Sequence, residues 1–349
     1  MKKRVVIGLS GGVDSSVAAY LLKEEGYEVL GVTMETWRET GDDCSQLAED
    51  ARRVADYLGI SHQVVDFRET FKETVVDSFM EEYRQGRTPN PCVICNRKVK
   101  WEALLSYAQE QGADYLATGH YARIVKLPSG RYSLKTSATA AKDQTYALYG
   151  LSQQQLSRTL MPVGEYEKQA IRDIARKVGI PVAEKPDSQE ICFIPDDDYV
   201  GFLRRNGGGG LIPGEFVTRE GKVLGQHKGI ACYTLGQRRG LELPMGHRVF
   251  VTEIRPEKNQ VVVGENQELF CERLRASHIN FMAVSDLGEG MEAIGKIRYN
   301  HRGAPCRVYQ TGPDELTAVF QEPQRAITPG QAFVFYTKDG CVAGGGTIL

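Results

Sequence analysis

The chain has 349 residues, enough for two or three domains that each bury a core. Its formal net charge of −2 excludes a generally basic protein, so any contact with nucleic acid has to come from a local basic patch. Neither a signal-peptide pattern nor an apolar run of membrane-spanning length occurs, which predicts a cytoplasmic protein with no membrane partner. In a reducing compartment the eight cysteines are expected to be thiols, metal ligands or catalysts rather than a disulfide framework.

Short apolar strands and amphipathic helices alternate over residues 1–125. The alternation predicts a parallel sheet with helices on both faces. Ligands bind such sheets at the carboxyl ends of the strands. The expected strands are Val5–Leu9, Glu28–Met34, His62–Phe67 and Tyr115–Thr118, and the expected helices are Ser15–Glu25, Cys44–Leu58, Phe71–Gln85 and Lys98–Gln111.

The later part of the chain changes character after about residue 205. Helical patterns over Leu151–Leu160 and Glu167–Val178 stop at Gly179. The run Gly207–Gly210 is typical of a flexible loop or hinge. Turn-separated alternating segments follow, and they predict small β-barrels. The expected strands there are Glu215–Thr218, Val249–Ile254, Gln260–Val263, Ala293–Tyr299, Cys306–Gln310, Leu316–Phe320 and Ala332–Tyr336. We therefore expect an α/β catalytic domain at 1–205, with a helical part at about 140–185, a small β domain at 206–270 and a β-barrel at 271–349.

The segment Ser10–Ser16 reads Ser-Gly-Gly-Val-Asp-Ser-Ser and lies between the first expected strand and helix. Glycines allow close backbone approach, and the unpaired N–H groups and dipole of a helix N-terminus attract phosphate. The segment matches neither G-x-x-x-x-G-K-[ST] nor G-x-G-x-x-G. It resembles the PP-loop of ATP pyrophosphatases, which split ATP into AMP and pyrophosphate and leave AMP on a substrate oxygen. The alternative is a glycine-rich turn without a ligand.

Cysteines form a second group of candidates. Cys92 and Cys95 make a Cys-x-x-Cys pair in an expected turn. Cations that follow the pair and the N-terminus of the Lys98 helix are expected to lower the pKa of these thiols. A redox pair, a zinc site and an iron–sulfur site are all open, although structural zinc needs four ligands and no second such pair occurs. A third cysteine, Cys192, follows the polar stretch Lys185–Glu190.

In their order along the chain, these motifs resemble those of the tRNA-specific 2-thiouridylases. The likeness runs the whole length of the chain. It rests on the segments Ser10–Ser15, Asn90–Asn96, Thr118–Tyr121, Lys142–Tyr146, Ser188–Ile194, Tyr233–Gly240, Lys296–Tyr299 and Thr328–Ala332. The resemblance implies a PP-loop domain that uses ATP and Mg²⁺ and a tRNA substrate.

The resemblance also implies a reaction. ATP adenylylates the C2 oxygen of the wobble uridine, which makes that oxygen a good leaving group, and persulfide sulfur then replaces it. Cys192 would carry the persulfide and Cys95 would release its sulfur, leaving a Cys95–Cys192 disulfide to be reduced. The family's substrates are tRNAs for Lys, Glu and Gln. The sulfur would come from a cysteine desulfurase or relay protein, and we expect a monomer on the tRNA.

Site residues carried over by the resemblance fall into two sets. ATP would contact Gly8, Leu9, Ser10, Gly11, Gly12, Val13, Asp14, Ser15, Met34 and Gly119, with Asp14 near Mg²⁺. The tRNA would contact Asn90, Pro91, Cys92, His120, Lys142, Asp143, Gln144, Arg298, Tyr299 and Gln331. Taken singly, these residues also fit a helix cap, a strand-end histidine, a solvated turn or an alternating strand pair.

Cys92 departs from the pattern, because some members of the family carry aspartate there. As a thiol it could join Cys95 and Cys192 as ligands to three irons of a [4Fe–4S] cluster with one iron left open. We favour the persulfide route, and the cluster stays open as an alternative. Two rival functions are an amide- or guanidine-forming PP-loop synthetase and an RNA-binding β-module with a vestigial nucleotide fold.

Overall fold

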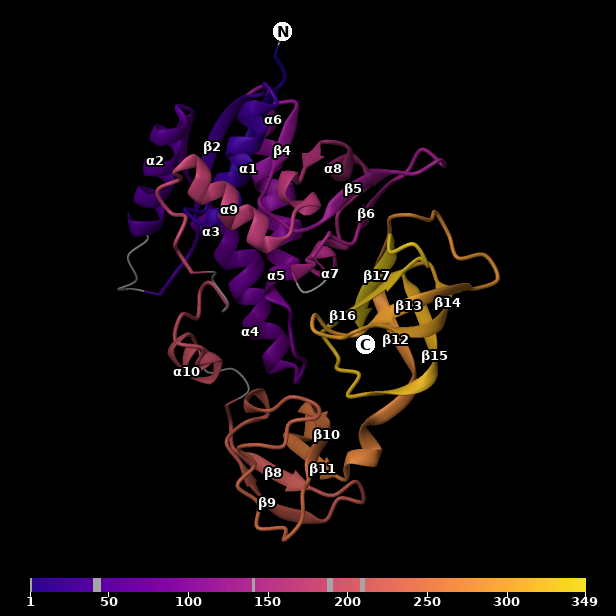
Figure 1. Ribbon diagram of the computed structural model, residues 1–349. Coiled ribbons are helices and arrows are strands. Elements are labelled where there is room, and N and C mark those ends of the chain that lie inside the picture. The colour runs from indigo at the N-terminus through magenta and orange to yellow at the C-terminus, as the bar shows by residue number, and fades with distance from the viewer. Residues whose placement is uncertain (1, 40–44, 140–141, 187–190, 208–210) are drawn as a thin grey trace.

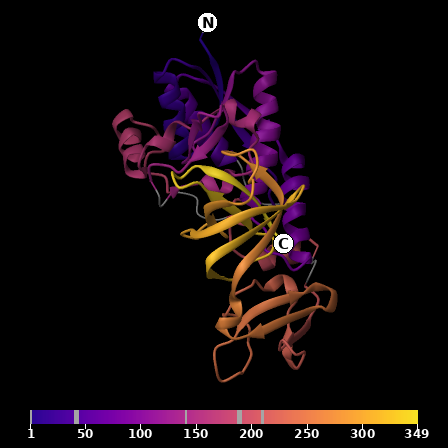
Figure 2. The ribbon, with the colours of Figure 1, turned by 90° about the vertical axis from the view of Figure 1, so that its right-hand side faces the viewer.

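The computed structural model describes residues 2–39, 45–139, 142–186, 191–207 and 211–349. A parallel-sheet domain, a small β domain and a β-barrel follow one another along the chain, and the barrel packs beside the first domain (Figure 1). Seen from the side, the three form a column with the small β domain at one end (Figure 2). The expected fold class is confirmed. Among the described residues, no helix has both the length and the apolar character needed to cross a membrane.

The central sheet has five parallel strands in the order β3-β2-β1-β4-β7. Its strands are β1 (Arg4–Gly8), β2 (Glu28–Glu35), β3 (Ser61–Asp66), β4 (Tyr115–Ala117) and β7 (Thr159–Leu160). Ile7 of β1 pairs with Gly31 on one side and with Ala117 on the other. The loop after β1 is therefore flanked by the carboxyl ends of β2 and β4.

Helices cover both faces of this sheet, as expected. Val5 and Ile7 of β1 face a core shared with α1, α2 and α9, whereas Val6 faces a core built by the α3–α4 and α5–α6 regions. The helices are α1 (Val13–Glu24), α2 (Ser45–Leu58), α3 (Arg68–Phe71), α4 (Asp77–Arg84), α5 (Pro91–Cys95), α6 (Leu105–Glu110), α7 (Thr145–Leu148), α8 (Gln153–Ser157), α9 (Lys168–Val178) and α10 (Tyr199–Arg205), with π-helical segments η1 (Lys72–Val76) and η2 (Asn96–Leu104).

Two local predictions were wrong. The Cys-x-x-Cys pair does not lie in a turn but in α5, because Asn90 caps this helix with its side chain and Pro91 occupies its first position. The helix then continues through η2 into α6, so it begins seven residues before the expected Lys98. The segment Leu151–Leu160 is helical only in α8, and its last residues form strand β7 instead.

Two β units follow. The small domain is a four-stranded sheet, and the C-terminal unit is a closed barrel of six strands in the order β12-β15-β14-β13-β16-β17. The small sheet contains β8 (Gly214–Val217), β9 (Val223–His227), β10 (Phe250–Arg255) and β11 (Gln260–Gly264). The barrel contains β12 (Phe270–Phe281), β13 (Met291–Lys296), β14 (Ala304–Gly312), β15 (Glu315–Arg325), β16 (Ala332–Tyr336) and β17 (Val342–Ile348), and a hairpin of β5 (Arg123–Lys126) and β6 (Tyr132–Lys135) extends from the first domain.

Strand β17 shows why part of the barrel was missed. Its centre is Gly344–Gly346, which reads as a turn in the sequence. A Cβ on Gly345 would lie 2.5 Å from the ring of Tyr149, and a Cβ on Gly344 would lie 2.6 Å from the Asn280 carbonyl oxygen. These glycines are therefore the residues that let β17 pack this closely. Strand β13 is also shorter than expected, so Tyr299 lies in the turn after it.

The barrel is joined to the first domain by hydrogen bonds beside the Cys-x-x-Cys helix, one between backbone groups and the others from side chains to backbone carbonyls. The Thr88 N–H donates to the Pro329 carbonyl at 2.9 Å. The side-chain amide of Gln331 donates to the carbonyls of Thr88 and Pro89, at 2.9 and 3.2 Å. The Tyr146 hydroxyl donates to the Ala332 carbonyl at 2.7 Å. The chain that enters α5 is therefore held by the barrel.

An aromatic cluster anchors the residue next to Cys192. The ring centroid of Phe193 lies 5.7 Å from that of Phe71, 5.4 Å from that of Phe79 and 5.3 Å from that of Phe202. Only 2% of Phe193 is exposed. Such edge-to-face pairs stabilise beyond the burial of their area, so this cluster fixes the chain at Cys192.

We expect Phe193→Ala to lower the free energy of unfolding of the first domain by about 3–5 kcal/mol, because it removes a fully buried ring. Urea unfolding followed by tryptophan fluorescence measures this, since both tryptophans, Trp37 and Trp101, lie in that domain. As a control, Val64→Ala removes an apolar side chain that is 46% exposed, and should change the value by under about 1 kcal/mol. Equal effects of the two substitutions would contradict the anchoring role.

Candidate active site at the edge of the parallel sheet

The loop between β1 and α1 is shaped by glycine. Gly11 has φ +67°, and a Cβ there would lie 2.7 Å from the Leu47 carbonyl oxygen. Gly12 precedes α1, and no side chain caps the helix. The hydroxyl of Ser15 turns back to accept a hydrogen bond from the Ser10 N–H at 3.2 Å. The loop therefore presents backbone N–H groups and the positive end of a 12-residue helix at the edge of the sheet.

Two neighbouring strand ends close around this loop. A Cβ on Gly119, just after β4, would lie 2.6 Å from the Ser15 nitrogen. On the other side the Thr33 hydroxyl donates to the Leu9 carbonyl at 2.8 Å, and Met34, the next residue of β2, is partly buried. The structure therefore brings the ATP candidates to one edge. A cradle of glycines that admits no Cβ fits a phosphate-bearing nucleotide.

The Asp14 carboxylate is already engaged. Lys168 Nζ lies 2.8 and 2.9 Å from its two oxygens, and the Tyr121 hydroxyl donates to it at 2.7 Å. Within the described part of the chain, no group of three or more His, Cys, Asp or Glu side chains is placed to hold a metal ion. The placement of Asp14 near Mg²⁺ stays a prediction.

Three thiols share one recess. Cys92 and Cys192 reach solvent and Cys95 is half-buried, yet protein surrounds all three on most sides, since desolvation is the largest influence on each of them. After burial, the charged forms of Cys95 and Cys92 are the next largest influences that raise the pKa of Cys192, so the three thiols are within electrostatic range of one another. All three are free thiols here.

The expectation that cations and a helix N-terminus lower these thiol pKa values was wrong. Burial raises the pKa of Cys92 and of Cys95, and it raises the pKa of Cys192 to about 12. Lys100 lowers the pKa of each thiol and Arg38 that of Cys192, but neither offsets burial. The resting thiols are therefore protonated at neutral pH.

Lys100 is a site residue that sequence reasoning named only among the cations after the pair. It lies in η2, and because a π-helix joins residues five apart, Cys95 and Lys100 share a turn. Lys100 Nζ lies 3.3 Å from His120 Nε2, and His120 Nδ1 lies 2.9 Å from the Thr118 hydroxyl. Burial, aided by Lys100, holds the pKa of His120 well below its usual value. Neutral His120 therefore accepts from Lys100 and donates to Thr118.

The barrel brings a candidate for tRNA contact to the thiols. Tyr299 is 42% exposed, and its pKa is raised by burial and then by the charges of Asp143 and Cys92. Residues from three distant parts of the chain therefore meet at this point. Arg298 beside it is exposed and donates to the Arg325 carbonyl at 3.2 Å.

Other tRNA candidates have internal partners. Asp143 is 9% exposed and accepts from the Ser137 N–H at 3.0 Å and the Thr145 hydroxyl at 2.6 Å. Gln144 accepts from the Tyr121 N–H at 2.8 Å. Gln331 holds the chain before α5, as described above. Lys142 is partly exposed. These contacts position the site, and the roles of these residues toward tRNA stay predictions.

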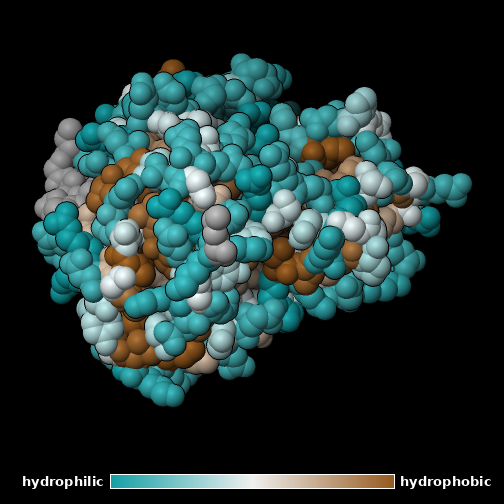
Figure 3. Space-filling view, turned by 90° about the horizontal axis from the view of Figure 1, so that it is seen from above, coloured by the Kyte–Doolittle hydropathy of each residue, from teal (hydrophilic) through white to brown (hydrophobic). Residues whose placement is uncertain are grey.

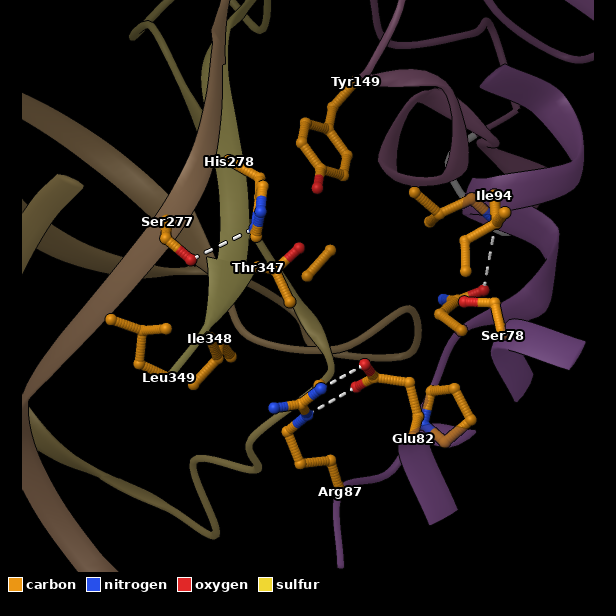
Figure 4. A pocket seen from close by; sticks show the side chains of 15 residues that line it. Ser78, Glu82, Arg87, Ile94, Tyr149, Ser277, His278, Thr347, Ile348 and Leu349 are labelled. Carbon is orange, nitrogen blue, oxygen red and sulfur yellow. Dashed lines mark hydrogen bonds and ion pairs between the residues drawn. The ribbon is translucent and has the colours of Figure 1, made fainter. Parts of the chain in front are cut away.

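A cavity of about 310 Å³ lies behind the Cys-x-x-Cys helix, between α4–α5 and barrel strands β12 and β17 (Figure 4). Asn90, Ile94 and Tyr149 are among the lining residues, as are Arg87 and Glu82, which form an ion pair. Seen from above, the molecule is largely hydrophilic, with hydrophobic residues showing mainly in recesses (Figure 3).

The parallel sheet and the glycine loop after its first strand define an α/β protein of the PP-loop class. Residues 3–196 match a family described as the tRNA methyl transferase HUP domain. Residues 201–265 match its PRC-barrel domain, and residues 271–348 match an aminomethyltransferase beta-barrel domain.

Full-length relatives are more specific. A tRNA-specific 2-thiouridylase MnmA of Lachnoclostridium phytofermentans is 57% identical over 356 aligned residues, covering 99% of each chain. The protein of the same name from Clostridium acetobutylicum is 52% identical, again over 99% of each chain. The chain belongs to the family of tRNA-specific 2-thiouridylases.

Among solved structures, the U34-tRNA thiolase NcsA of Methanococcus maripaludis with its [4Fe-4S] cluster is 20% identical, with a TM-score of 0.36 over 59% of this chain and 67% of that one. A likeness this weak does not bear on the choice between a persulfide and a cluster.

We expect alkylation of Cys192 by iodoacetamide to keep rising about tenfold per pH unit up to pH 10, because only the thiolate reacts and its pKa is about 12. An unperturbed thiol levels off near pH 9. Lys100→Met removes the charge that lowers the thiol pKa values, so it should slow alkylation of all three cysteines about two- to tenfold below pH 9. Peptide mapping by mass spectrometry separates them from the other cysteines.

Lys98→Met is the matched control, because Lys98 pairs with Glu102 on the exposed side of the same helical region. It should leave the alkylation rates within about twofold of the wild type. Equal slowing by the two substitutions would show that Lys100 has no special place among the thiols.

Proposed function

We propose that the chain catalyses ATP-dependent 2-thiolation of the uridine at the wobble position of tRNA. The carrying observation is that Lys100, whose charge acts on all three thiols, lies 3.3 Å from His120, the residue after Gly119 of the phosphate site, and that Tyr299 interacts with Cys92. The full-length relatives carry the name of this activity. ATP, Mg²⁺ and a tRNA are the proposed ligands.

The first step activates the base. The C2 oxygen of uridine attacks the α-phosphorus of ATP, the bond to the β-phosphate oxygen breaks, and pyrophosphate leaves. Backbone N–H groups at the start of α1 and the dipole of this helix support binding of the charged phosphates. Met34 and Gly119 are the proposed contacts of the nucleoside part.

The second step delivers sulfur. A persulfide on Cys192 attacks C2 through its outer sulfur, and AMP leaves with the former C2 oxygen. The Cys95 thiolate then attacks the inner sulfur of Cys192, so the S–S bond breaks, its electron pair stays with the transferred sulfur, and a Cys95–Cys192 disulfide remains. A reductant that supplies two electrons restores the thiols.

The resting Cys192 thiol is itself a weak nucleophile at neutral pH. With a pKa of about 12, almost none of the resting thiol is ionised at neutral pH. A persulfide is a strong nucleophile under those conditions, and the positive charge of Lys100 in the same recess favours the anionic form. The sulfur on Cys192 would come from a cysteine desulfurase or relay protein.

The barrel turn that carries Arg298 and Tyr299 is the proposed contact for the target loop. An aromatic ring and a guanidinium suit an unstacked base of a single-stranded loop. Asn90, Cys92 and His120 of the first domain are the further proposed contacts, and the charge of Cys92 acts on Tyr299. We propose a monomer acting in the cytoplasm on tRNAs for Lys, Glu and Gln.

The iron–sulfur alternative is not favoured. Cys92, Cys95 and Cys192 all belong to the described residues, and within those no three side chains of metal-ligating type are placed to hold a metal ion. We therefore derive no step through a cluster. The family model for residues 3–196 is described as a tRNA methyl transferase domain. Methyl transfer would assign no role to Cys92, Cys95 and Cys192, so we do not favour it.

The central test is mass analysis of the wobble uridine after reaction of tRNA with ATP and a sulfur donor. We expect sulfur in place of the C2 oxygen, with AMP and pyrophosphate formed. Cys95→Ser and Cys192→Ser should lower product at least about 10³-fold, because each removes a reacting sulfur. Cys271→Ser changes an exposed thiol of the barrel and should leave the rate unchanged. An unaltered uridine with every tRNA would refute the proposed function.

A second test separates the two sulfur routes. Cys92→Ser should retain at least about a tenth of the activity in the persulfide route, because Cys92 takes no part in the S–S exchange. The cluster route would lose nearly all activity. Anaerobic purification with iron analysis and visible absorption gives an independent measurement, in which activity without iron excludes the cluster.

A further inference from the structure

The phosphate loop contains no basic side chain, and two lysines reach it from elsewhere in the chain. Lys168 of α9 places Nζ 2.8 and 2.9 Å from the oxygens of Asp14. Lys185 places Nζ 3.2 Å from the Gly11 carbonyl oxygen and 2.7 Å from an oxygen of Asp50. The P-loop of other nucleotide-binding proteins carries a lysine of its own for the β- and γ-phosphates. Here both ammonium groups are supplied from outside.

Both lysines can leave their carboxylates without exposing an unpaired buried charge. Asp50 has a side chain only 7% exposed. Burial alone would raise its pKa, but hydrogen bonds from Lys185, Arg53 and Gln46 lower it to about 2. Without Lys185, the carboxylate keeps Arg53 and Gln46.

Asp14 is arranged in the same way. Without Lys168 it keeps the hydroxyl of Tyr121, which donates at 2.7 Å. Its side chain is 30% exposed, so water can also reach it, whereas that of Lys168 is 14% exposed. Lys168 Nζ also lies over the Tyr121 ring, 5.8 Å from its centroid. The ammonium group is therefore held at the beginning of α1 whether or not it touches Asp14.

We propose that Lys168 and Lys185 are the cations that bind the phosphates of ATP in this loop. This inference rests on the proposed function, because it assigns residues to the same nucleotide site. The dipole of α1 amounts to about half a positive charge, which falls well short of balancing a triphosphate. When ATP binds, the ammonium group of each lysine moves from its carboxylate to phosphate oxygens. The Asp14 oxygens that Lys168 contacted are then free to accept other partners.

The test compares binding of ATP and of AMP, both with Mg²⁺, by isothermal titration calorimetry. Lys168→Ala and Lys185→Ala should each weaken ATP binding about tenfold or more, because each removes a charge-assisted hydrogen bond. AMP has one phosphate and should lose at most about threefold. Lys185→Arg, which keeps the charge, should retain ATP binding within about threefold of the wild type.

Lys177→Ala is the matched control, because Lys177 is an exposed lysine in the last turn of the same helix, α9. It should leave the affinity for both nucleotides unchanged. Lysine variants that bind ATP with wild-type affinity would overturn the inference. An equal loss of affinity for ATP and for AMP would also overturn it, because it indicates a distorted loop. A wild-type chain that binds no ATP would instead refute the proposed function.

Discussion

The hydrogen-bonded register of β1 between two parallel neighbours is the constraint on which the rest of the structure depends. Parallel strands bring their carboxyl ends to one edge, so the loop after β1 lies between Met34 of β2 and the chain leaving β4. Gly119 completes that arrangement, because its backbone packs against the first turn of α1 with no room for a Cβ. One face of the sheet then carries the helical region with Cys92 and Cys95. A nucleotide edge and a sulfur recess follow from a single strand order.

Electrostatics sets the second constraint, because the site has to gather charge from distant elements. Burial makes the thiols poor acids, and Lys100 of η2 lowers the pKa of all three. The loop in turn depends on lysines from α9 and from the chain after it. Recesses that exclude water strengthen each such charge, since fields are less screened there. The phosphate loop needs positive charge to bind an anion, whereas burial keeps the thiols protonated. Both environments can therefore exist in the same domain.

The sequence predicted what local patterns encode. Apolar alternation and glycine turns identified the parallel sheet and its phosphate loop, and motif order identified the candidate site. Long-range contacts were out of reach: nothing local marks Lys168 or Lys185, and the spacing of Cys95 and Lys100 is informative only once η2 is known to be π-helical. Strand β17 was not among the expected strands, and its three central glycines are required by close packing. The prediction that the thiol pKa values are lowered was wrong because burial, which raises them, depends on tertiary packing. The expected start of the helix at Cys44 and residues 187–190 of the polar stretch before Cys192 lie outside the described residues.

The clasp between barrel and first domain has a consequence for how such proteins can diverge. Thr88 and Pro89 lie just before the Cys-x-x-Cys helix, and Pro329 and Gln331 form hydrogen bonds with their backbone. Gln331 donates to backbone carbonyls, so substitutions at Thr88 and Pro89 keep these hydrogen bonds, whereas position 331 needs the side-chain amide. A crossover between residues 91 and 328 of two relatives joins Thr88 and Pro89 of one parent to position 331 of the other, so the hydrogen bonds persist only if the second parent also has glutamine there. The two segments are therefore inherited best as a pair, although some 240 positions separate them in the gene.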